Sequence, residues 1–260
     1  MCIGCRMRRA EDWSLRVMHE ASLWDENCFV TLTYGRDKLP ANGSLCHEDF
    51  QKFMKRLRKQ ANVRFYMCGE YGPLNGRPHY HACLFNVNFW DRVPAGKSKS
   101  GAVFYSSAAL SQLWTHGIVS VQDLTPETAS YCARYIMKKQ LGEDAKRAYD
   151  YVDEDGVLCQ RRPEYSAMSL KPGIGAGWFQ KFGSDVFPHD IAVDANGREK
   201  RPPKYYDKLL KRSKAVVQDD IEFARYNRAK ESAPDNTDER RSVREAVHLA
   251  RVSTLNRGDI

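Results

Sequence analysis

The chain has 260 residues, 42% of them hydrophobic, which excludes a largely disordered chain and allows one good-sized domain with appendages or two small domains. Its formal net charge of +8 favours an anionic partner, with nucleic acid as the first candidate. The sequence contains no run of about 18 apolar residues, so a membrane span is excluded.

The cysteines indicate the redox compartment. Eight are scattered along the chain, several within apolar patterns, which favours a reducing, cytoplasmic environment over a disulfide framework. The first nine residues lack the apolar core of a secretory signal. Cys2 and Cys5 form a single Cys-x-x-Cys pair, which is half of a zinc site. Because no second half is obvious, a terminus without metal is the favoured interpretation.

Hydrophobic periodicity predicts the elements of the first 142 residues. Four segments have the apolar spacing of helices: 9–24, 48–60, 107–116 and 126–141. Four segments have the β-branched and aromatic composition of strands: 28–34, 64–70, 79–85 and 118–122. The second and third strands should form an antiparallel hairpin. Residues 94–101 are predicted to be a loop, and Gly117 is predicted to end the third helix as its C′ glycine.

The composition changes after residue 142. Turn residues predict hairpins at 153–156 and 196–197, and glycines predict a flexible loop at 171–177. From about residue 205 the chain is charged and helical, with a polar break at 233–238. The predicted fold class is α+β, with a mostly antiparallel central sheet of about five strands, helices packed on it, and a charged helical C-terminal extension.

Three residues of the predicted hairpin could bind a metal ion. His79 and His81 are two positions apart in a strand, so both side chains point to the same face of the sheet. Glu70 ends the partner strand and is expected across from them. Two imidazole nitrogens and one carboxylate oxygen suit Mg²⁺ or Mn²⁺ with positions open for substrate, and Zn²⁺ and Fe²⁺ also accept such ligands. The alternative is that both histidines are core residues bonded to the backbone.

The helix predicted over residues 126–141 has an apolar arc and, opposite it, two tyrosines one turn apart, Tyr131 and Tyr135. A tyrosine hydroxyl has a pKa near 10 and is a poor nucleophile at neutral pH. A divalent cation and a nearby ammonium would favour the phenolate, and Lys138 and Lys139 are placed to supply the ammonium. The alternative is a pair of surface tyrosines without a catalytic role.

These motifs, in this order, resemble those of the HUH endonuclease superfamily of rolling-circle replication initiators. They are Glu70, then His79-Tyr80-His81, then the segment from Tyr131 to Lys139; residues 29–34 resemble the structural first motif. Further segments are similar to the gokushovirus branch of the Microviridae: 18–21, 68–72, 77–81 and 171–175. The resemblance covers roughly residues 2–185. The predicted division is therefore an N-terminal helical segment, an HUH endonuclease core, accessory hairpins with a glycine-rich loop, and a charged tail, at 1–27, 28–142, 143–204 and 205–260.

The resemblance implies an enzyme that nicks and rejoins single-stranded DNA at a viral origin. Glu70, His79 and His81 would hold a divalent metal ion. One tyrosine would form a 5′-phosphotyrosyl link and release a 3′-hydroxyl that primes the host polymerase, and the second would cut again after a round of synthesis. The protein would start and end replication of a small phage genome in the cytoplasm of a bacterial host. Because no Walker A pattern occurs, a host helicase is expected to unwind the DNA.

Basic residues around this face are the candidate DNA contacts: Arg77, Arg134 and Lys171. Ordinary solvated charges are the alternative for each of them. A related relaxase or transposase, or a non-catalytic module that binds single-stranded DNA, also remains open. A nucleotide hydrolase of the histidine-triad type would need a third histidine where Cys83 stands.

Overall fold

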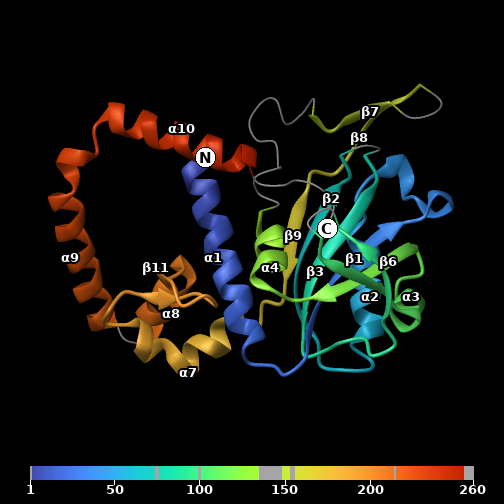
Figure 1. The fold of residues 1–260 in the computed structure, drawn as a ribbon, viewed down its shortest axis with the longest axis horizontal. Coiled ribbons are helices and arrows are strands. Elements are labelled where there is room, and N and C mark those ends of the chain that lie inside the picture. The colour runs from blue at the N-terminus through green and yellow to red at the C-terminus, as the bar shows by residue number, and fades with distance from the viewer. Residues whose placement is uncertain are drawn as a thin grey trace.

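The computed structural model describes residues 2–73, 76–98, 101–134, 148–152, 156–213 and 215–254. These residues form an α+β fold with helices on both faces of a seven-stranded sheet, as Figure 1 shows. The predicted fold class is confirmed, although the sheet has seven strands rather than about five. None of the described helices has both the length and the apolar character needed to cross a membrane.

The main sheet is antiparallel throughout, and its order is β4-β5-β6-β1-β3-β2-β9. The strands are β1 Asn27–Tyr34, β2 Arg64–Tyr71, β3 Pro78–Phe85, β4 Val93–Lys97, β5 Val103–Ser106, β6 Gly117–Asp123 and β9 Tyr165–Met168. The predicted hairpin of β2 and β3 therefore lies near the middle of the sheet. One edge strand, β9, comes from the segment that the sequence assigned to accessory hairpins.

Alternating side chains give the sheet two apolar faces. One face packs against α2 (His47–Leu57) and α3 (Ala108–Leu113), and Tyr80, Ala82 and Leu84 of β3 point into that core. The other face packs against α1 (Ile3–Ala21) and α4 (Pro126–Ala133), and the alternate residues of β3 point there. Both histidines of β3 therefore lie under α1 and α4.

The C-terminal helices form a third core on the far side of α1, which stands between them and the sheet (Figure 1). They are α7 Ala176–Val186, α8 Lys204–Ser213, α9 Ala215–Glu231 and α10 Asp238–Thr254, with the short helix η3 Ala233–Asp235 at the predicted polar break. Two small hairpins confirm the predicted turns: β7 Asp150–Val152 with β8 Leu158–Gln160, and β10 Ala192–Val193 with β11 Glu199–Lys200.

Two predictions near residue 100 are wrong. The predicted loop contains β4 and β5, which extend the sheet beyond β6. These strands are largely exposed, so they lack the apolar alternation that marks a half-buried strand. Gly117 begins β6 instead of ending a helix. Its φ is +147°, and a Cβ there would lie 2.2 Å from the Gly35 nitrogen, so the close approach of two backbones requires glycine.

The predicted flexible loop at 171–177 is anchored to α1. Ile174 is fully buried, and its carbonyl accepts a hydrogen bond from Arg16 Nε at 3.0 Å. The Gly175 N–H donates to a carboxylate oxygen of Glu20 at 2.7 Å. These contacts attach the start of α7 to α1, so the glycines serve a tight connection rather than a free loop.

Candidate active site

The two strands of the central hairpin bring the predicted metal ligands together. In the β2–β3 register, Glu70 lies opposite His79, and Cys68 lies opposite His81. The ligand atoms of Glu70, His79 and His81 all lie within 4.8 Å of one another, and this is the only such group found in the described part of the chain. Glu70 and His81 are 1% and 2% exposed, and His79 is half-buried. The predicted position of Glu70 across from the histidines is confirmed.

Hydrogen bonds orient both imidazole rings. His79 Nδ1 lies 3.1 Å from the carbonyl oxygen of Arg77, which can only accept, so Nδ1 carries the proton and Nε2 is the coordinating nitrogen. His81 Nδ1 lies 3.0 Å from Thr31 Oγ1 on the neighbouring strand β1. Outer partners of this kind fix the rotation and tautomer of metal-binding histidines. The two nitrogens and one carboxylate oxygen therefore fit a divalent cation, with positions open for substrate.

Tyr131 lies directly over these histidines. Its ring centroid is 4.8 Å from that of His81, in an edge-to-face arrangement, and 6.4 Å from that of Phe29. The side chain is only 7% exposed. The prediction that Tyr131 faces away from the apolar arc of its helix is therefore wrong. Because α4 is covered by both α1 and the sheet, its buried arc is wider than the spacing of apolar residues indicates.

Helix α4 has the local features needed to hold Tyr131 in place. Thr125 and Thr128 form a capping box at its start, and Pro126 follows the cap. The side chains of Ala129, Cys132 and Ala133 are completely buried, and their small size allows the helix to approach the sheet. The hydroxyls of Ser14 and Ser130, 2.9 Å apart, join α4 to α1.

The space beneath α4 contains neutral sulfur atoms. The Cys68 thiol donates to a carboxylate oxygen of Glu70 at 3.4 Å, and the Cys132 sulfur lies 3.6 Å from that of Cys68. Burial raises the pKa of both thiols well above the usual value, so neither adds a negative charge beside Glu70. Cys2, in contrast, caps α1 by accepting from the Cys5 N–H at 3.4 Å, and the structure places neither cysteine in a metal-binding group of described residues.

The predicted DNA contacts fall into different surroundings. Arg134 caps the end of α4; burial lowers the pKa of its guanidinium, and the nearby Tyr131 and Glu70 partly offset this effect. Arg77 directly precedes β3 and bonds to His79 through its carbonyl. Lys171 is exposed beside the start of β2, where the Pro172 carbonyl binds Arg64. That end of β2 is about 20 Å from Glu70, so Lys171 lies outside the immediate site.

Three further predicted residues, Tyr135, Lys138 and Lys139, lie outside the described residues. Two features of the site were missed in the sequence. The first is Thr31, a polar residue on the inward face of the β1 motif, which could have been recognised from its position opposite His81. The second is a cavity of about 660 Å³ in which Tyr131 and Arg134 form part of the wall, together with residues of α1 and of the β10–β11 hairpin.

Comparisons with known proteins agree with this geometry. The family described as Replication-associated protein ORF2 matches residues 27–140, a segment that contains the three candidate metal ligands and both tyrosines. Replication-associated protein VP4 of Bdellovibrio phage phiMH2K is 32% identical over 222 residues, which cover 82% of this chain and 66% of that protein. Replication-associated protein ORF2 of Spiroplasma virus 4 is 30% identical over 225 residues, covering 81% and 66%.

A third relative, replication-associated protein ORF4 of Chlamydia phage 1, is 28% identical over 234 residues, which cover 85% of this chain and 54% of the relative. No solved structure matches the chain. The fold, the site and these matches define a class, the replication proteins of small phages of the Microviridae type. The chain belongs to the Replication-associated protein ORF2 family, and the predicted likeness to a rolling-circle replication initiator is confirmed at this level. It spans about two thirds of the length of the first two relatives.

Proposed function

We propose that this protein nicks and rejoins single-stranded DNA at a viral origin by metal-dependent transesterification at tyrosine, and so starts and ends rolling-circle replication of a small phage genome. The observation that carries the proposal is the contact between Tyr131 and His81, with ring centroids 4.8 Å apart. A non-catalytic module that binds single-stranded DNA would not need a phenol beside a group of metal ligands.

Glu70, His79 and His81 would hold the cation, Mg²⁺ or Mn²⁺. When bound, the cation would polarise the scissile phosphate and offset charge in the transition state. The phenolic oxygen of Tyr131 forms a bond to phosphorus and loses its proton, while the bond from phosphorus to the 3′ oxygen breaks and that oxygen takes up a proton. Arg134, beside Tyr131 and Glu70, is placed to bind a non-bridging phosphate oxygen.

The products of this step are a 5′-phosphotyrosyl link and a free 3′-hydroxyl. In the proposed cycle, Tyr135 makes the second cut after a round of synthesis, with Lys138 and Lys139 as the neighbouring ammonium groups. The released 3′-hydroxyl then attacks the first phosphotyrosyl bond and closes the circle. A host polymerase would extend the 3′ end and a host helicase would unwind the template, in the cytoplasm of the bacterial host.

A denaturing gel tests the nucleophile. The protein is incubated with single-stranded origin DNA and Mn²⁺, and a covalent adduct is expected that disappears with EDTA. The double variant Tyr131→Phe/Tyr135→Phe and the variant His81→Ala should both abolish the adduct. Tyr226→Phe is the matched control, since Tyr226 is 65% exposed on α9. An adduct that persists in the double variant, or DNA binding without any adduct in the wild type, contradicts the proposal.

A further inference from the structure

The β10–β11 hairpin forms the outer wall of the cavity that contains Tyr131. One wall of this cavity of about 660 Å³ comes from α1, and a second comes from α4 through Ser130, Tyr131 and Arg134. The third wall is the hairpin, with Asn196 at its turn and Arg198 and Lys200 on its returning side. Cavities of several hundred Å³ are large enough for ligands of nucleotide size.

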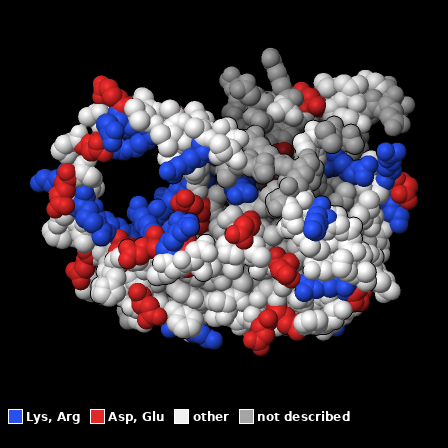
Figure 2. Space-filling model, viewed as in Figure 1, with Lys and Arg blue, Asp and Glu red and all other residues white. Residues whose placement is uncertain are grey.

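A second hollow continues this cavity past the hairpin. It has a volume of about 630 Å³, shares Glu199, Lys200 and Arg201 with the first cavity, and extends to Arg225 and Arg228 of α9. Figure 2 shows the same side of the molecule as an open hollow with Lys and Arg side chains around its edge. A continuous surface therefore leads from the candidate nucleophile to the C-terminal helices.

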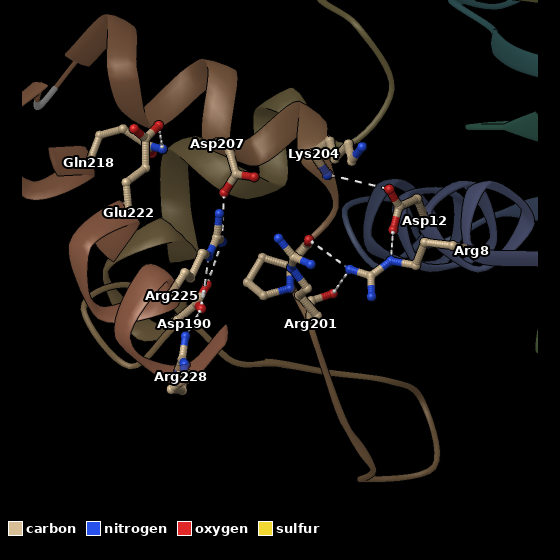
Figure 3. A network of polar contacts seen from close by, with 11 residues as sticks. Arg8, Asp12, Asp190, Arg201, Lys204, Asp207, Gln218, Glu222, Arg225 and Arg228 are labelled. Carbon is tan, nitrogen blue, oxygen red and sulfur yellow. Dashed lines mark hydrogen bonds and ion pairs between the residues drawn. The ribbon is translucent and has the colours of Figure 1, made fainter. Parts of the chain in front are cut away.

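The segment that follows β11 is fixed to α1, as Figure 3 shows. The Arg8 guanidinium donates to the carbonyls of Arg201 and Pro202, each at 3.5 Å. Asp12 accepts from Arg8 at 3.0 Å and from the Lys204 N–H at 3.4 Å. All of these bonds to the hairpin segment use its backbone, so its side chains are not needed to hold it in place.

The segment that precedes β10 is fixed to α9. Asp190 accepts from the guanidinium groups of Arg225 and Arg228, both at 2.5 Å, and Arg225 also binds Asp207 at 2.9 Å (Figure 3). With both ends attached, the hairpin is held in position over Tyr131 before any ligand arrives. A binding site that is already in position loses less conformational entropy on binding.

The charges of this wall favour an anionic ligand. Several carboxylates are occupied within the protein: Asp12 and Asp190 by arginines, and Asp194 by the N–H groups of Asn196 and Arg198. No ion pair between described residues involves Arg198 or Arg201, and both side chains are exposed. Lys200 has only a long contact of 3.9 Å with Asp194.

We propose that this cavity holds the nucleotides next to the scissile phosphate, with Arg198, Lys200 and Arg201 bound to their phosphates. The inference rests on the proposed function, because it places that phosphate at Tyr131. A single strand that reaches Tyr131 must continue along one of the walls around it, and the hairpin wall combines cations with room for bases. The Asn196 amide at the turn can donate to and accept from an unpaired base.

The test is DNA binding by the full chain in EDTA, measured by fluorescence anisotropy, so that no cleavage is required. The triple variant Arg198→Ala/Lys200→Ala/Arg201→Ala should bind single-stranded origin DNA at least about tenfold more weakly. The slope of log affinity against log salt concentration should also fall by about 2, from roughly 0.7 for each lost phosphate contact. Replacing Arg198 and Arg201 with lysine should restore most of the binding, because the positive charges are kept.

The matched control removes the same charge from the opposite face of the sheet. Lys52→Ala/Lys55→Ala/Lys59→Ala lies on or just after α2, where all three side chains are exposed, and should leave the affinity unchanged. An unchanged affinity in the hairpin variant, or an equal loss in the control, overturns the inference. Covalent adduct formation is measured separately: if the wild type forms no adduct but the hairpin variant still loses binding, the proposed chemistry fails and the binding surface stands.

Discussion

His81 is surrounded by side chains that restrict it to one orientation. Phe29 stacks on its ring at 5.6 Å between centroids, Tyr131 and His79 meet it edge to face at 4.8 Å, and Thr31 contacts Nδ1. Core histidines that merely satisfy the backbone were the alternative in the sequence. The backbone bond of His79 through Nδ1 is compatible with both interpretations, but the placement of Glu70 and Tyr131 around the other atoms favours a metal site.

The hydroxyl of Thr31 provides a prediction at the scale of a single residue. Thr31→Val preserves the shape of the side chain but removes the hydroxyl next to His81 Nδ1. The affinity for Mn²⁺ should fall by about tenfold or more, as for other outer partners of metal-binding histidines. Isothermal titration calorimetry measures it. Thr33→Val, on the same face and opposite His79, is the control, and equal affinities for all three proteins would refute the role of Thr31.

His19 provides a prediction about pH. Its ring stacks on Trp178 at 3.6 Å, its Nδ1 lies 2.8 Å from the Tyr206 hydroxyl, and burial lowers its pKa to about 4. The unfolded chain, with an ordinary histidine pKa near 6.5, binds a proton in the interval where the folded chain does not. The contribution of His19 is therefore fully present above about pH 6.5 and is lost as the pH falls toward 4, by on the order of 3 kcal/mol.

Urea unfolding at about pH 7 and about pH 4.5 tests this pH dependence. His19→Phe keeps an aromatic ring in the stack but has no titratable group, so its stability should fall less between the two pH values. A variant with the pH dependence of the wild type would assign that dependence to other groups.

At the scale of elements, α1 connects the parts of the molecule. It packs on the sheet beside α4, contributes Leu15 to the C-terminal core, and approaches α10 where Gly4 meets His248. The two short segments that resemble gokushovirus proteins, 18–21 and 171–175, meet at its end. Glu20 binds Arg64 of β2 at 2.5 Å and the Gly175 N–H at 2.7 Å, while Arg64 also binds the Pro172 carbonyl. These segments therefore have a structural role.

Glu20→Ala tests this junction. The substitution leaves the guanidinium of Arg64, which is 13% exposed, without its carboxylate and removes the acceptor for Gly175. Unfolding should become easier by about 3–5 kcal/mol, as for other buried ion pairs that lose one partner. Urea unfolding monitored by tryptophan fluorescence measures the change. Asp235→Ala, in an exposed pair with Arg240, is the control without a measurable effect, and a similarly small effect of Glu20→Ala would contradict the assigned role.

At the scale of the whole molecule, two apolar units share α1 but differ in what they hold. The sheet unit carries the metal ligands and Tyr131, and the C-terminal unit holds the hairpin that faces them. The hairpin is attached to the C-terminal unit mainly through Arg225, whose pKa is raised by its hydrogen bond to Asp190. The two walls of the cavity therefore belong to different units.

Arg225→Ala should separate these two roles. Loss of the guanidinium leaves Asp190 and Asp207 without their shared partner and releases the segment before β10. Hydrogen exchange at residues 190–204 should become faster and single-stranded DNA should bind more weakly, while Mn²⁺ affinity at the sheet remains unchanged. Mass spectrometry of peptic fragments measures the exchange. Unchanged exchange in that segment, or a parallel loss of Mn²⁺ affinity, would contradict the separation.

The sequence by itself determined the metal ligands, because the period of a strand places His79 and His81 on one face and a short hairpin turn places Glu70 beside them. These are local relations that need no knowledge of distant contacts. For the same reason, the order of the central strands and helices and the helical character of the tail were predicted correctly.

Tertiary structure alone decided which way Tyr131 faces, because burial of α4 depends on α1 as well as on the sheet. It also decided that β4 and β5 extend the sheet, since exposed edge strands have no apolar alternation. The cavity wall formed by residues 194–201 is the clearest case, because those residues come more than 60 positions after Tyr131. Only the packing of the C-terminal helices on α1 brings them to the site.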